Sequence, residues 1–260
     1  MNVLLVAGVK GGVGVTTVVA HLATALSYQG KSVVALDLCS ANQLGLLLGL
    51  PYGEHRGLVT QVAIGEPWYS ACFQSKAGVY IVPHGYIEGE SSKSKQASSE
   101  RIYTAINDQL DALVGDDIES IDLPFDSWLI VDFSSAYNLP LDWQKLLCRA
   151  DLMIMVTNTD AVSYSCLNRT FEDQQAIGTS KMMCLINKYS SSNLLERDIY
   201  DSIQHQFSKQ LFPVTVHDDK NIGQSLASKQ TVFEYAQHSQ ACRDFGLLGT
   251  WLVAGQCENQ

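Results

Sequence analysis

Short apolar segments alternate with longer stretches of helical character along this chain. The apolar segments cover residues 3–7, 32–36, 79–82, 128–131, 152–156, 182–186 and 214–216. Several of them are apolar throughout instead of alternating between apolar and polar positions, which is typical of parallel strands covered by helices. Because strands and helices alternate, the pattern predicts an α/β fold with a twisted, predominantly parallel sheet and helices on both faces.

The first apolar segment leads into a glycine-rich loop, which reads Gly-Val-Lys-Gly-Gly-Val-Gly-Val-Thr-Thr over residues 8–17. Apolar residues at helical spacing follow the loop, and Gly30 is the expected stop of that helix. At the N-terminus of a helix, unpaired backbone N–H groups and the helix dipole attract an anion. A strand, a glycine turn and a helix in this order therefore predict a phosphate-binding loop. A tight glycine turn without a ligand is the alternative.

The loop departs from the standard phosphate-binding pattern G-x-x-x-x-G-K-[ST], because Val9 replaces its first glycine and Val15 replaces its lysine. A second pattern, K-G-G-x-G-x-T, fails at Val15 alone. Lys10 then becomes the informative cation, and Thr16 supplies the hydroxyl expected to bind Mg²⁺. The predicted nucleotide-binding residues of the loop are Lys10, Gly11, Gly12, Val13, Gly14, Val15, Thr16 and Thr17.

Polar residues lie at the ends of four predicted strands: Lys10, Asp37, Asp132 and Asn187. The C-terminal ends of parallel strands meet at one edge of a sheet, where ligands of such folds bind, so we expect one site. Asp132 ends an apolar strand, the position from which a carboxylate holds Mg²⁺ in many NTPases. The alternatives are a strand-end cap for Asp132, a turn residue for Asn187 and a solvated loop charge for Lys10.

The glycine loop resembles the deviant Walker A motif of the MinD/ParA family of P-loop ATPases, and the similarity extends along most of the chain. Within that family the chain resembles the BcsQ proteins of bacterial cellulose biosynthesis more closely. Several matched motifs in one order are more specific than any one of them. Besides the missing second loop lysine, the matches are Asp37-Leu38-Cys39 followed by Asn42, Leu185-Ile186-Asn187, and the segment from His217 to Tyr235.

The resemblance implies ATP and Mg²⁺ as ligands and gives roles to the matched residues. Lys10 would reach across a face-to-face homodimer to the partner's ATP, and the amide of Asn187 would pair with adenine. Asp37 resembles the first carboxylate of the family's D-x-D motif and would act with Lys10 in catalysis. Cys39 replaces the second carboxylate, which positions the attacking water, and a thiol is a poor hydrogen-bond acceptor. The implied metal ligands are Thr16, Asp37 and Asp132.

Hydrolysis is expected to be slow or absent, because Val15 and Cys39 replace two groups that assist phosphoryl transfer. The resemblance implies an ATP-bound scaffold or regulator of bacterial cellulose synthesis and secretion. Such a homodimer would work with small proteins such as BcsR and BcsE at the inner-membrane cellulose synthase complex. The alternative is a cycling ParA-type ATPase that positions chromosome, plasmid or flagellar cargo.

Composition limits the architecture. With 260 residues, of which 46% are apolar, the chain is expected to form one domain, residues 1–260. Residues 87–126 are more polar and predict a peripheral insertion with a helix near 101–113, for which a docking surface is the functional alternative to a solvated segment. Seven cysteines without a C-x-x-C pair argue against a disulfide framework or a zinc cluster.

Charge limits the partners. The net charge is −10 and the lysines and arginines are scattered, so the sequence predicts no nucleic-acid binding and little attraction to anionic lipid. No secretory signal is evident, and no apolar run reaches the about 18 residues that a membrane span needs. We expect a cytoplasmic protein that is recruited to the inner face of the inner membrane through partners. The apolar face of its C-terminal helix is expected to pack against the sheet.

Overall fold

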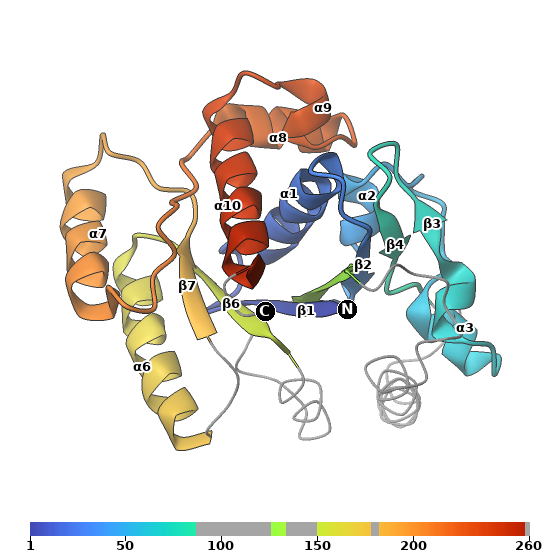
Figure 1. Cartoon of the computed structure of the whole chain (residues 1–260), viewed down its shortest axis with the longest axis horizontal. Helices are drawn as coiled ribbons and strands as arrows, with labels where there is room; N and C mark the ends of the chain where they lie inside the picture. The colour runs from blue at the N-terminus through green and yellow to red at the C-terminus, as the bar shows by residue number, and fades with distance from the viewer. Residues whose placement is uncertain (87–125, 134–149, 178–181, 258–260) are drawn as a thin grey trace.

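The computed structural model describes residues 1–86, 126–133, 150–177 and 182–257 (Figure 1). The predicted insertion at 87–126, with its helix, lies outside these residues except for its last position. The described strands are β1 (Asn2–Gly8), β2 (Val33–Asp37), β3 (Phe73–Gln74), β4 (Tyr80–Val82), β5 (Trp128–Phe133), β6 (Leu152–Thr157) and β7 (Met182–Ile186). The described helices are α1 (Val15–Tyr28), α2 (Leu44–Leu47), α3 (Leu58–Ala63), the 3₁₀ helix η1 (Trp68–Ala71), α6 (Ala161–Ile177), α7 (Leu194–Phe207), α8 (Lys220–Ala227), α9 (Val232–Tyr235) and α10 (Gln240–Cys257).

The strands of the described residues form one sheet in the order β3-β4-β2-β5-β1-β6-β7. Neighbouring strands are parallel except for β3 and β4. The predicted α/β fold with a predominantly parallel sheet is therefore confirmed, and six of the seven predicted strands are present. Every residue of β5 and β6 is buried, as their continuous apolar sequences indicate. The two-residue strand β3 was not predicted, because so short a segment has no readable periodicity.

The prediction of a continuous strand at residues 214–216 is wrong. Its segment runs beside β7 but forms isolated bridges instead of a ladder. The N–H of Phe212 donates to the carbonyl of Cys184 in β7. The next such bond runs from the N–H of Val216 to the carbonyl of Ile186. Between the two bonds the segment advances by four residues, whereas β7 advances by two. Pro213 lies in this interval, and its ring fixes φ in a way that suits an interruption better than the interior of a regular ladder.

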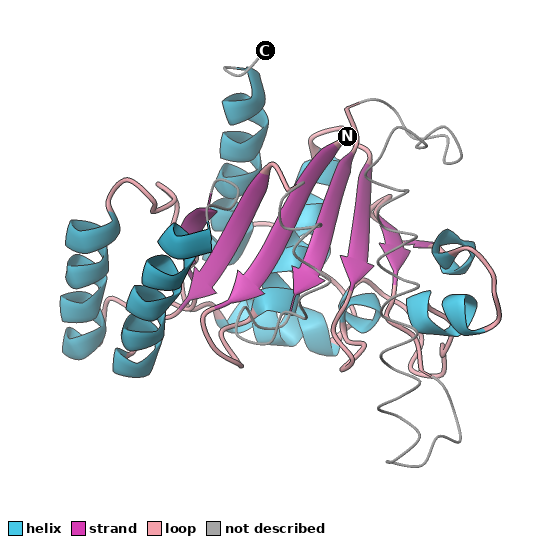
Figure 2. Cartoon of the chain, turned by 90° about the horizontal axis from the view of Figure 1, so that it is seen from below, coloured by secondary structure: helices cyan, strands magenta, loops and turns pink. Residues whose placement is uncertain are grey.

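Helices cover both faces of the sheet (Figures 1 and 2). Helix α1 packs on the central strands, and its side chains Val18, Val19 and Leu22 are fully buried. Helix α6 lies on the opposite face near the β7 edge. Helix α7 packs against α6 through the stacked rings of Phe171 and Phe207, whose centroids are 4.8 Å apart. Helices on both faces were predicted, and the structure confirms them.

The apolar face of the C-terminal helix α10 is buried, but it packs chiefly on α1 and not directly on the sheet as predicted. The ring of Phe245 stacks on His21 with centroids 4.8 Å apart. A Cβ added to Gly249 would lie 3.3 Å from the Cβ of Ala25, so the two helices approach closely. None of the described helices, α10 included, combines the length and apolarity needed to cross a bilayer.

The C-terminal ends of the parallel strands meet along one edge of the sheet, the edge to which the arrows point in Figure 2. In the strand register, Val6 of β1 and Asp37 of β2 both lie opposite Asp132 of β5. The glycine loop leaves β1 at this edge, and Asn187 follows β7 there. The topology therefore brings the predicted site residues to one place.

The imidazole of His21 is enclosed between α1 and α10. The side chain is fully buried, its Nδ1 donates to the carbonyl oxygen of Thr17 at 2.8 Å, and its Nε2 has no partner among the described residues. Burial lowers the pKa of His21 to about 4, although the Thr17 carbonyl favours the charged form. A neutral ring is therefore part of the packing that supports the first turns of α1.

Replacing His21 is expected to change how stability depends on pH. Because the pKa of His21 is lower in the folded state, the unfolded chain binds the extra proton, and stability is lost as the pH falls from about 6.5 towards 4. Relative to His21→Leu, the wild type should lose about 2–3 kcal/mol of unfolding free energy over this range. Urea unfolding at pH 7 and pH 4.5 measures the difference. The exposed His205→Leu is the control, and a pH-independent difference for His21→Leu would contradict the prediction.

Candidate functional site

The glycine loop joins β1 to α1 and requires glycine at two positions. Gly14 is the N-cap of α1 with φ of 96°, and Gly12 has φ of 80°, so both lie in the left-handed region. A Cβ at Gly14 would also lie 2.6 Å from Nδ2 of Asn187. Helix α1 continues for 14 residues, and its unpaired first N–H groups open onto the loop. The loop has the form expected of an anion-binding turn.

Val15, which replaces the lysine of the standard motif, points into the core. It is 6% exposed, and a Cβ added to Gly8 would lie 3.0 Å from its Cγ2 and 2.7 Å from Cγ2 of the fully buried Val13. Both valines therefore pack the underside of the loop and bring no charge to it. The other uncharged loop residues of the predicted site are exposed or half-buried: Gly11, Gly12, Gly14, Thr16 and Thr17.

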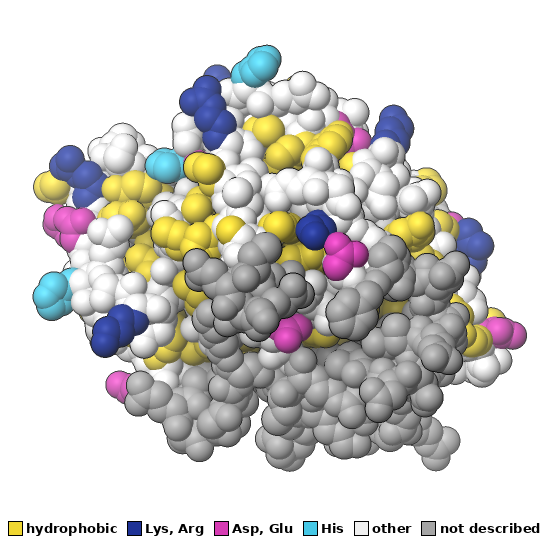
Figure 3. All heavy atoms as spheres, viewed as in Figure 1, with side chains coloured by type: hydrophobic (Ala, Val, Ile, Leu, Met, Phe, Trp, Pro, Cys, Tyr) yellow, Lys and Arg dark blue, Asp and Glu magenta, His cyan; other side chains and the backbone are white. Residues whose placement is uncertain are grey.

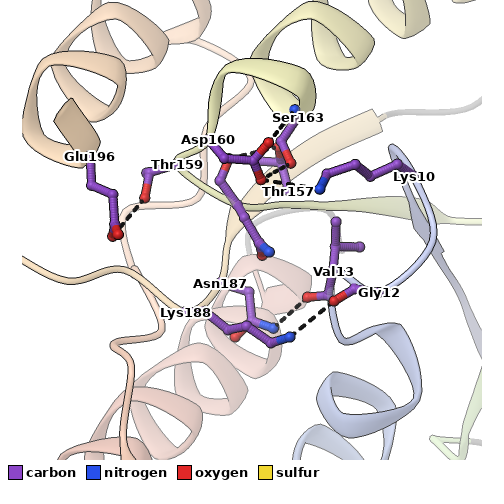
Figure 4. A network of polar contacts seen from close by, with 11 residues as sticks. Lys10, Gly12, Val13, Thr157, Thr159, Asp160, Ser163, Asn187, Lys188 and Glu196 are labelled. Carbon is purple, nitrogen blue, oxygen red and sulfur yellow. Dashed lines mark hydrogen bonds and ion pairs between the residues drawn. The ribbon is translucent and has the colours of Figure 1, made fainter. Parts of the chain in front are cut away.

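Lys10 is paired within its own chain (Figure 4). Its Nζ lies 3.2 Å from Oδ2 of Asp160, the residue just before α6. The same carboxylate accepts hydrogen bonds from the backbone N–H of Ser163 at 2.9 Å and from its hydroxyl at 2.6 Å. Partial burial disfavours ionisation of Asp160, but the bonds from Ser163 and Lys10 outweigh it and hold the pKa below its ordinary value. Lys10 is therefore directed towards the start of α6.

Asp37 is fully buried at the end of β2 and organises the segment that follows. Its Oδ1 accepts the N–H of Cys39 at 2.9 Å, and its Oδ2 accepts the N–H of Leu44 at 3.0 Å. Burial and the neighbouring charge of Asp132 raise the pKa of Asp37, and these backbone bonds offset the shift only in part. Cys39, which stands where the second carboxylate was expected, is half-buried.

Asp132 is the least satisfied polar group of this edge. Its side chain is fully buried, and neither carboxylate oxygen has a hydrogen-bond partner within the described ranges. Burial raises the pKa of Asp132, and the nearby hydroxyl of Thr16 opposes this shift in part. A buried carboxylate without partners is costly, so such a group in a folded protein is suited to bind a cation, a water molecule or a proton.

The donor set fits a magnesium ion. Mg²⁺ takes oxygen ligands and commonly combines one or two carboxylates with water and substrate phosphates. Asp132 and Asp37 face each other in the strand register, and Thr16 lies in the first turn of α1 beside them. Within the described residues, no group of three or more His, Cys, Asp or Glu could hold a metal by itself. A metal at this place would therefore complete its shell with phosphate and water oxygens.

Two neighbouring residues after β7 contact the glycine loop (Figure 4). Asn187 is 2% exposed and its Nδ2 donates to the carbonyl oxygen of Val13 at 2.8 Å. Lys188 donates from Nζ to the carbonyl oxygen of Gly12 at 2.9 Å. The predicted contact of Asn187 with adenine stays a prediction, but the side chain already has a role in holding the loop.

The structure thus brings every predicted site residue to one sheet edge and adds two that the sequence did not reveal. Asp160 and Lys188 were missed. For Asp160 a signal existed, since an Asp three residues before Ser163 is a typical helix start. For Lys188 the sequence contained no signal of a contact with the loop beyond its position directly after Asn187.

The fold is that of the MinD/ParA-like P-loop NTPases. The MinD cell division protein of Aquifex aeolicus superposes with a TM-score of 0.76 at 16% identity, covering 98% of both chains. MinD of Pyrococcus horikoshii complexed with Mg-ADP has a TM-score of 0.70 at 19% identity, covering 98% of this chain and 97% of that one. Cobyrinic acid a,c-diamide synthase of Mycobacterium smegmatis with a bound ATP analogue and magnesium has a TM-score of 0.69 at 20% identity, covering 100% and 97%.

The chain belongs to the family of the cellulose biosynthesis protein BcsQ, whose family model matches residues 1–253. BcsQ of Escherichia coli K12 is 28% identical over 255 residues, covering 97% of this chain and 94% of the relative. BcsQ of Salmonella typhi is 26% identical over 254 residues with the same coverage. An uncharacterised ATP-binding protein of Methanocaldococcus jannaschii is 26% identical over 260 residues, covering 97% and 88%. The resemblance seen in the motifs is confirmed.

Replacing Asp132 is expected to remove the effect of magnesium on nucleotide-dependent stability. Asp132→Asn keeps the shape of the side chain but takes away the buried carboxylate that fits the ion. In the wild type, ATP with Mg²⁺ should raise Tm by several degrees more than ATP with a chelator, whereas in the variant this increment should fall below about 1 °C. Thermal unfolding followed by circular dichroism measures it. Asp126→Asn, at an exposed ion pair with Lys31, is the control. An unchanged increment in Asp132→Asn would exclude this carboxylate as a ligand.

Proposed function

We propose that this chain is an ATP-binding, MinD/ParA-like scaffold or regulator of bacterial cellulose synthesis and secretion. One observation carries the proposal: the glycine loop at the N-terminus of α1 lies beside two buried carboxylates, and Asp132 has no hydrogen-bond partner within the described residues. A phosphate-bound Mg²⁺ would satisfy both features. Membership of the BcsQ family supplies the connection with cellulose.

The groups that would hold Mg-ATP lie together at this edge. Related folds have been seen with Mg-ADP and with an ATP analogue and magnesium, and one archaeal relative is named as ATP-binding. The loop N–H groups would bind the phosphates, and Thr16, Asp37 and Asp132 would hold the ion directly or through water. Asn187 is the proposed contact with adenine. Bound Mg²⁺ neutralises phosphate charge and fixes the geometry of the phosphates.

Weak or absent hydrolysis follows from the residues around the phosphates. Val15 is buried and uncharged, and Cys39 presents a thiol where a carboxylate would position water. Lys10 is bonded to Asp160 in the single chain. Residual catalysis would depend on Lys10 and Asp37. Because phosphoryl transfer is accelerated mainly by positioning and charge neutralisation, this site is better suited to retaining ATP than to turning it over.

A homodimer with two nucleotide sites facing each other is the proposed assembly. The side chains of Lys10 and Asp160 are 32% and 43% exposed, and an ion pair this accessible contributes little, so Lys10 is able to exchange Asp160 for a partner's phosphates. At the same edge, the starts of α6 and α7 expose Val162 at 61%, Leu194 at 64% and Leu195 at 61%. A second copy would cover this apolar area.

The proposed setting is the cytoplasm, with recruitment to the inner face of the inner membrane by protein partners. Small proteins of the cellulose system such as BcsR and BcsE, together with the synthase complex, are the proposed partners. Nucleic acid is not among them, because the net charge is −10. On the face seen in Figure 3, Lys and Arg side chains lie apart and form no continuous stripe.

A cycling ParA-type ATPase that positions chromosome, plasmid or flagellar cargo is the second candidate. The fold is compatible with it, since the superposed MinD structures are cell division proteins. Such a cycle needs efficient hydrolysis, which Val15 and Cys39 disfavour. The two candidates therefore differ in the fate of bound ATP.

The nucleotide retained by the purified protein tests the choice. After purification with Mg²⁺ and denaturation, chromatography should identify intact ATP. The double variant Val15→Lys with Cys39→Asp should release mainly ADP and hydrolyse ATP at least about tenfold faster, because it restores both missing groups. Val15→Met with Cys39→Ser is the uncharged control. Released ADP or DNA-stimulated turnover in the wild type would favour the cycling ATPase, and failure to bind ATP would refute both. Normal cellulose secretion by a deletion strain would remove the cellulose assignment.

Removing the ammonium of Lys10 is expected to abolish ATP-dependent dimerisation. Lys10→Ala leaves the loop backbone unchanged but cannot reach the phosphates of a second copy. Light scattering with Mg-ATP should show a dimer for the wild type and a monomer for the variant. Lys31→Ala, which also breaks a partly exposed ion pair, is the matched control and should dimerise normally. An intact Lys10→Ala dimer would show that this lysine does not act across the interface.

A further inference from the structure

Lys188 and Asn187 bind two successive carbonyl groups in the middle of the glycine loop (Figure 4). Lys188 donates to Gly12 at 2.9 Å, and Asn187 donates to Val13 at 2.8 Å. The residues come from the end of β7, whereas the loop follows β1, with β6 between the two strands. The end of β7 therefore holds the loop from one side at two neighbouring points.

These bonds determine the direction of two loop N–H groups. Within a planar trans peptide unit, the C=O and the N–H point in opposite directions, and none of the described peptide bonds is cis. The carbonyl of Gly12 shares its unit with the N–H of Val13, and the carbonyl of Val13 shares its unit with the N–H of Gly14. Since both carbonyls face β7, both N–H groups face away from it. Neither has an acceptor among the described residues, so both are available to an anion.

Lys188 differs from Asn187 because it is charged. A cation on a carbonyl oxygen polarises the peptide unit and makes its N–H a stronger donor. Val15 brings no charge to the loop, and the charge of Lys10 is balanced by Asp160. Lys188 pairs with no carboxylate within the described residues. At the loop, the charge of Lys10 is therefore balanced by a carboxylate, whereas the charge of Lys188 is not.

The backbone at Lys188 is shaped for this contact. Its φ of 56° lies in the left-handed region, which non-glycine residues adopt rarely. Its Cε would lie 3.5 Å from a Cβ placed on Gly14, so the lysine stem passes over the start of α1. A side chain larger than hydrogen at Gly14 would collide with Asn187, at 2.6 Å. The loop and the end of β7 therefore fit each other as a unit.

We propose that Lys188 is a positioning residue of the phosphate site. With Asn187 it orients the N–H groups of Val13 and Gly14 before the ligand arrives, and its charge strengthens the donation of the Val13 N–H to phosphate. It thereby offsets, from the opposite side of the loop, the loss of the lysine that Val15 replaces. The inference rests on the proposed function, because it concerns how the proposed ATP site holds its ligand.

The effect should depend on the ligand's phosphates. In Lys188→Met, which keeps the stem and loses the ammonium, we expect ATP and inorganic pyrophosphate to bind about tenfold more weakly, as expected when a hydrogen bond to a charged group is lost. Adenosine, which has no phosphate, should change less than about twofold. Lys188→Arg should bind ATP within about threefold of the wild type. Isothermal titration and competition with a fluorescent nucleotide measure these constants.

A measurement without nucleotide distinguishes a changed orientation of the loop N–H groups from a general loss of stability in the variant. In ¹⁵N-labelled protein, the amide proton shifts of Val13 and Gly14 should change in Lys188→Met and return towards the wild type in Lys188→Arg, with Tm nearly unchanged. The exposed Lys209→Met has no contact with the loop and is the matched control.

The outcomes distinguish the inference from the function on which it rests. A wild type that binds no ATP would overturn both. If the wild type binds ATP and the Lys188→Met variant binds it equally well, the role of Lys188 is overturned and the proposed function is not. An equal loss of ATP and adenosine binding would place Lys188 at the base and would also overturn it. A selective loss of phosphate-bearing ligands with altered loop amide shifts supports the inference.

Discussion

Two buried carboxylates beside a glycine loop are the constraint around which this structure is arranged. The parallel register places Asp37 and Asp132 side by side at the ends of neighbouring strands, and burial of both works against their ionisation. Asp37 is compensated by two backbone N–H groups, whereas Asp132 has no partner among the described residues. Buried acidic groups at this edge require a cation or protons, and the unpaired N–H groups of the loop next to them favour an anion. A metal-bound polyphosphate would meet both needs.

The loop keeps the geometry typical of phosphate sites, while its charges are rearranged. Gly12 and Gly14 maintain the backbone conformation, and α1 presents its first N–H groups. The usual lysine position is occupied by Val15, which packs in the core, so the positive charge at the loop comes from other positions. Lys10 is held at the start of α6, and Lys188 comes from β7. In the proposed ATP site, this arrangement would bind phosphate without concentrating charge on the transferred group, which is why we expect retention of ATP more than hydrolysis.

Retention of a nucleotide agrees with the setting that the BcsQ family provides. A scaffold must hold its shape for as long as its assembly lasts, and a bound ligand stabilises the folded state by mass action. The apolar residues exposed near Lys10 at the starts of α6 and α7 offer area for a second copy on the same edge. Assembly and nucleotide would then depend on each other, because Lys10 cannot bind both Asp160 and a partner's phosphates.

The sequence by itself determined the elements and the positions at their ends. Continuous apolar runs predicted parallel strands, and the rule that such strands end at one edge placed Lys10, Asp37, Asp132 and Asn187 together. Only the tertiary structure decided the partners. Asp160 and Lys188 lie far from the loop in sequence, and which side chain meets which carbonyl depends on strand order and register, which local patterns do not contain. The interrupted ladder at Pro213 and the packing of α10 on α1 were settled in the same way, by contacts between distant segments.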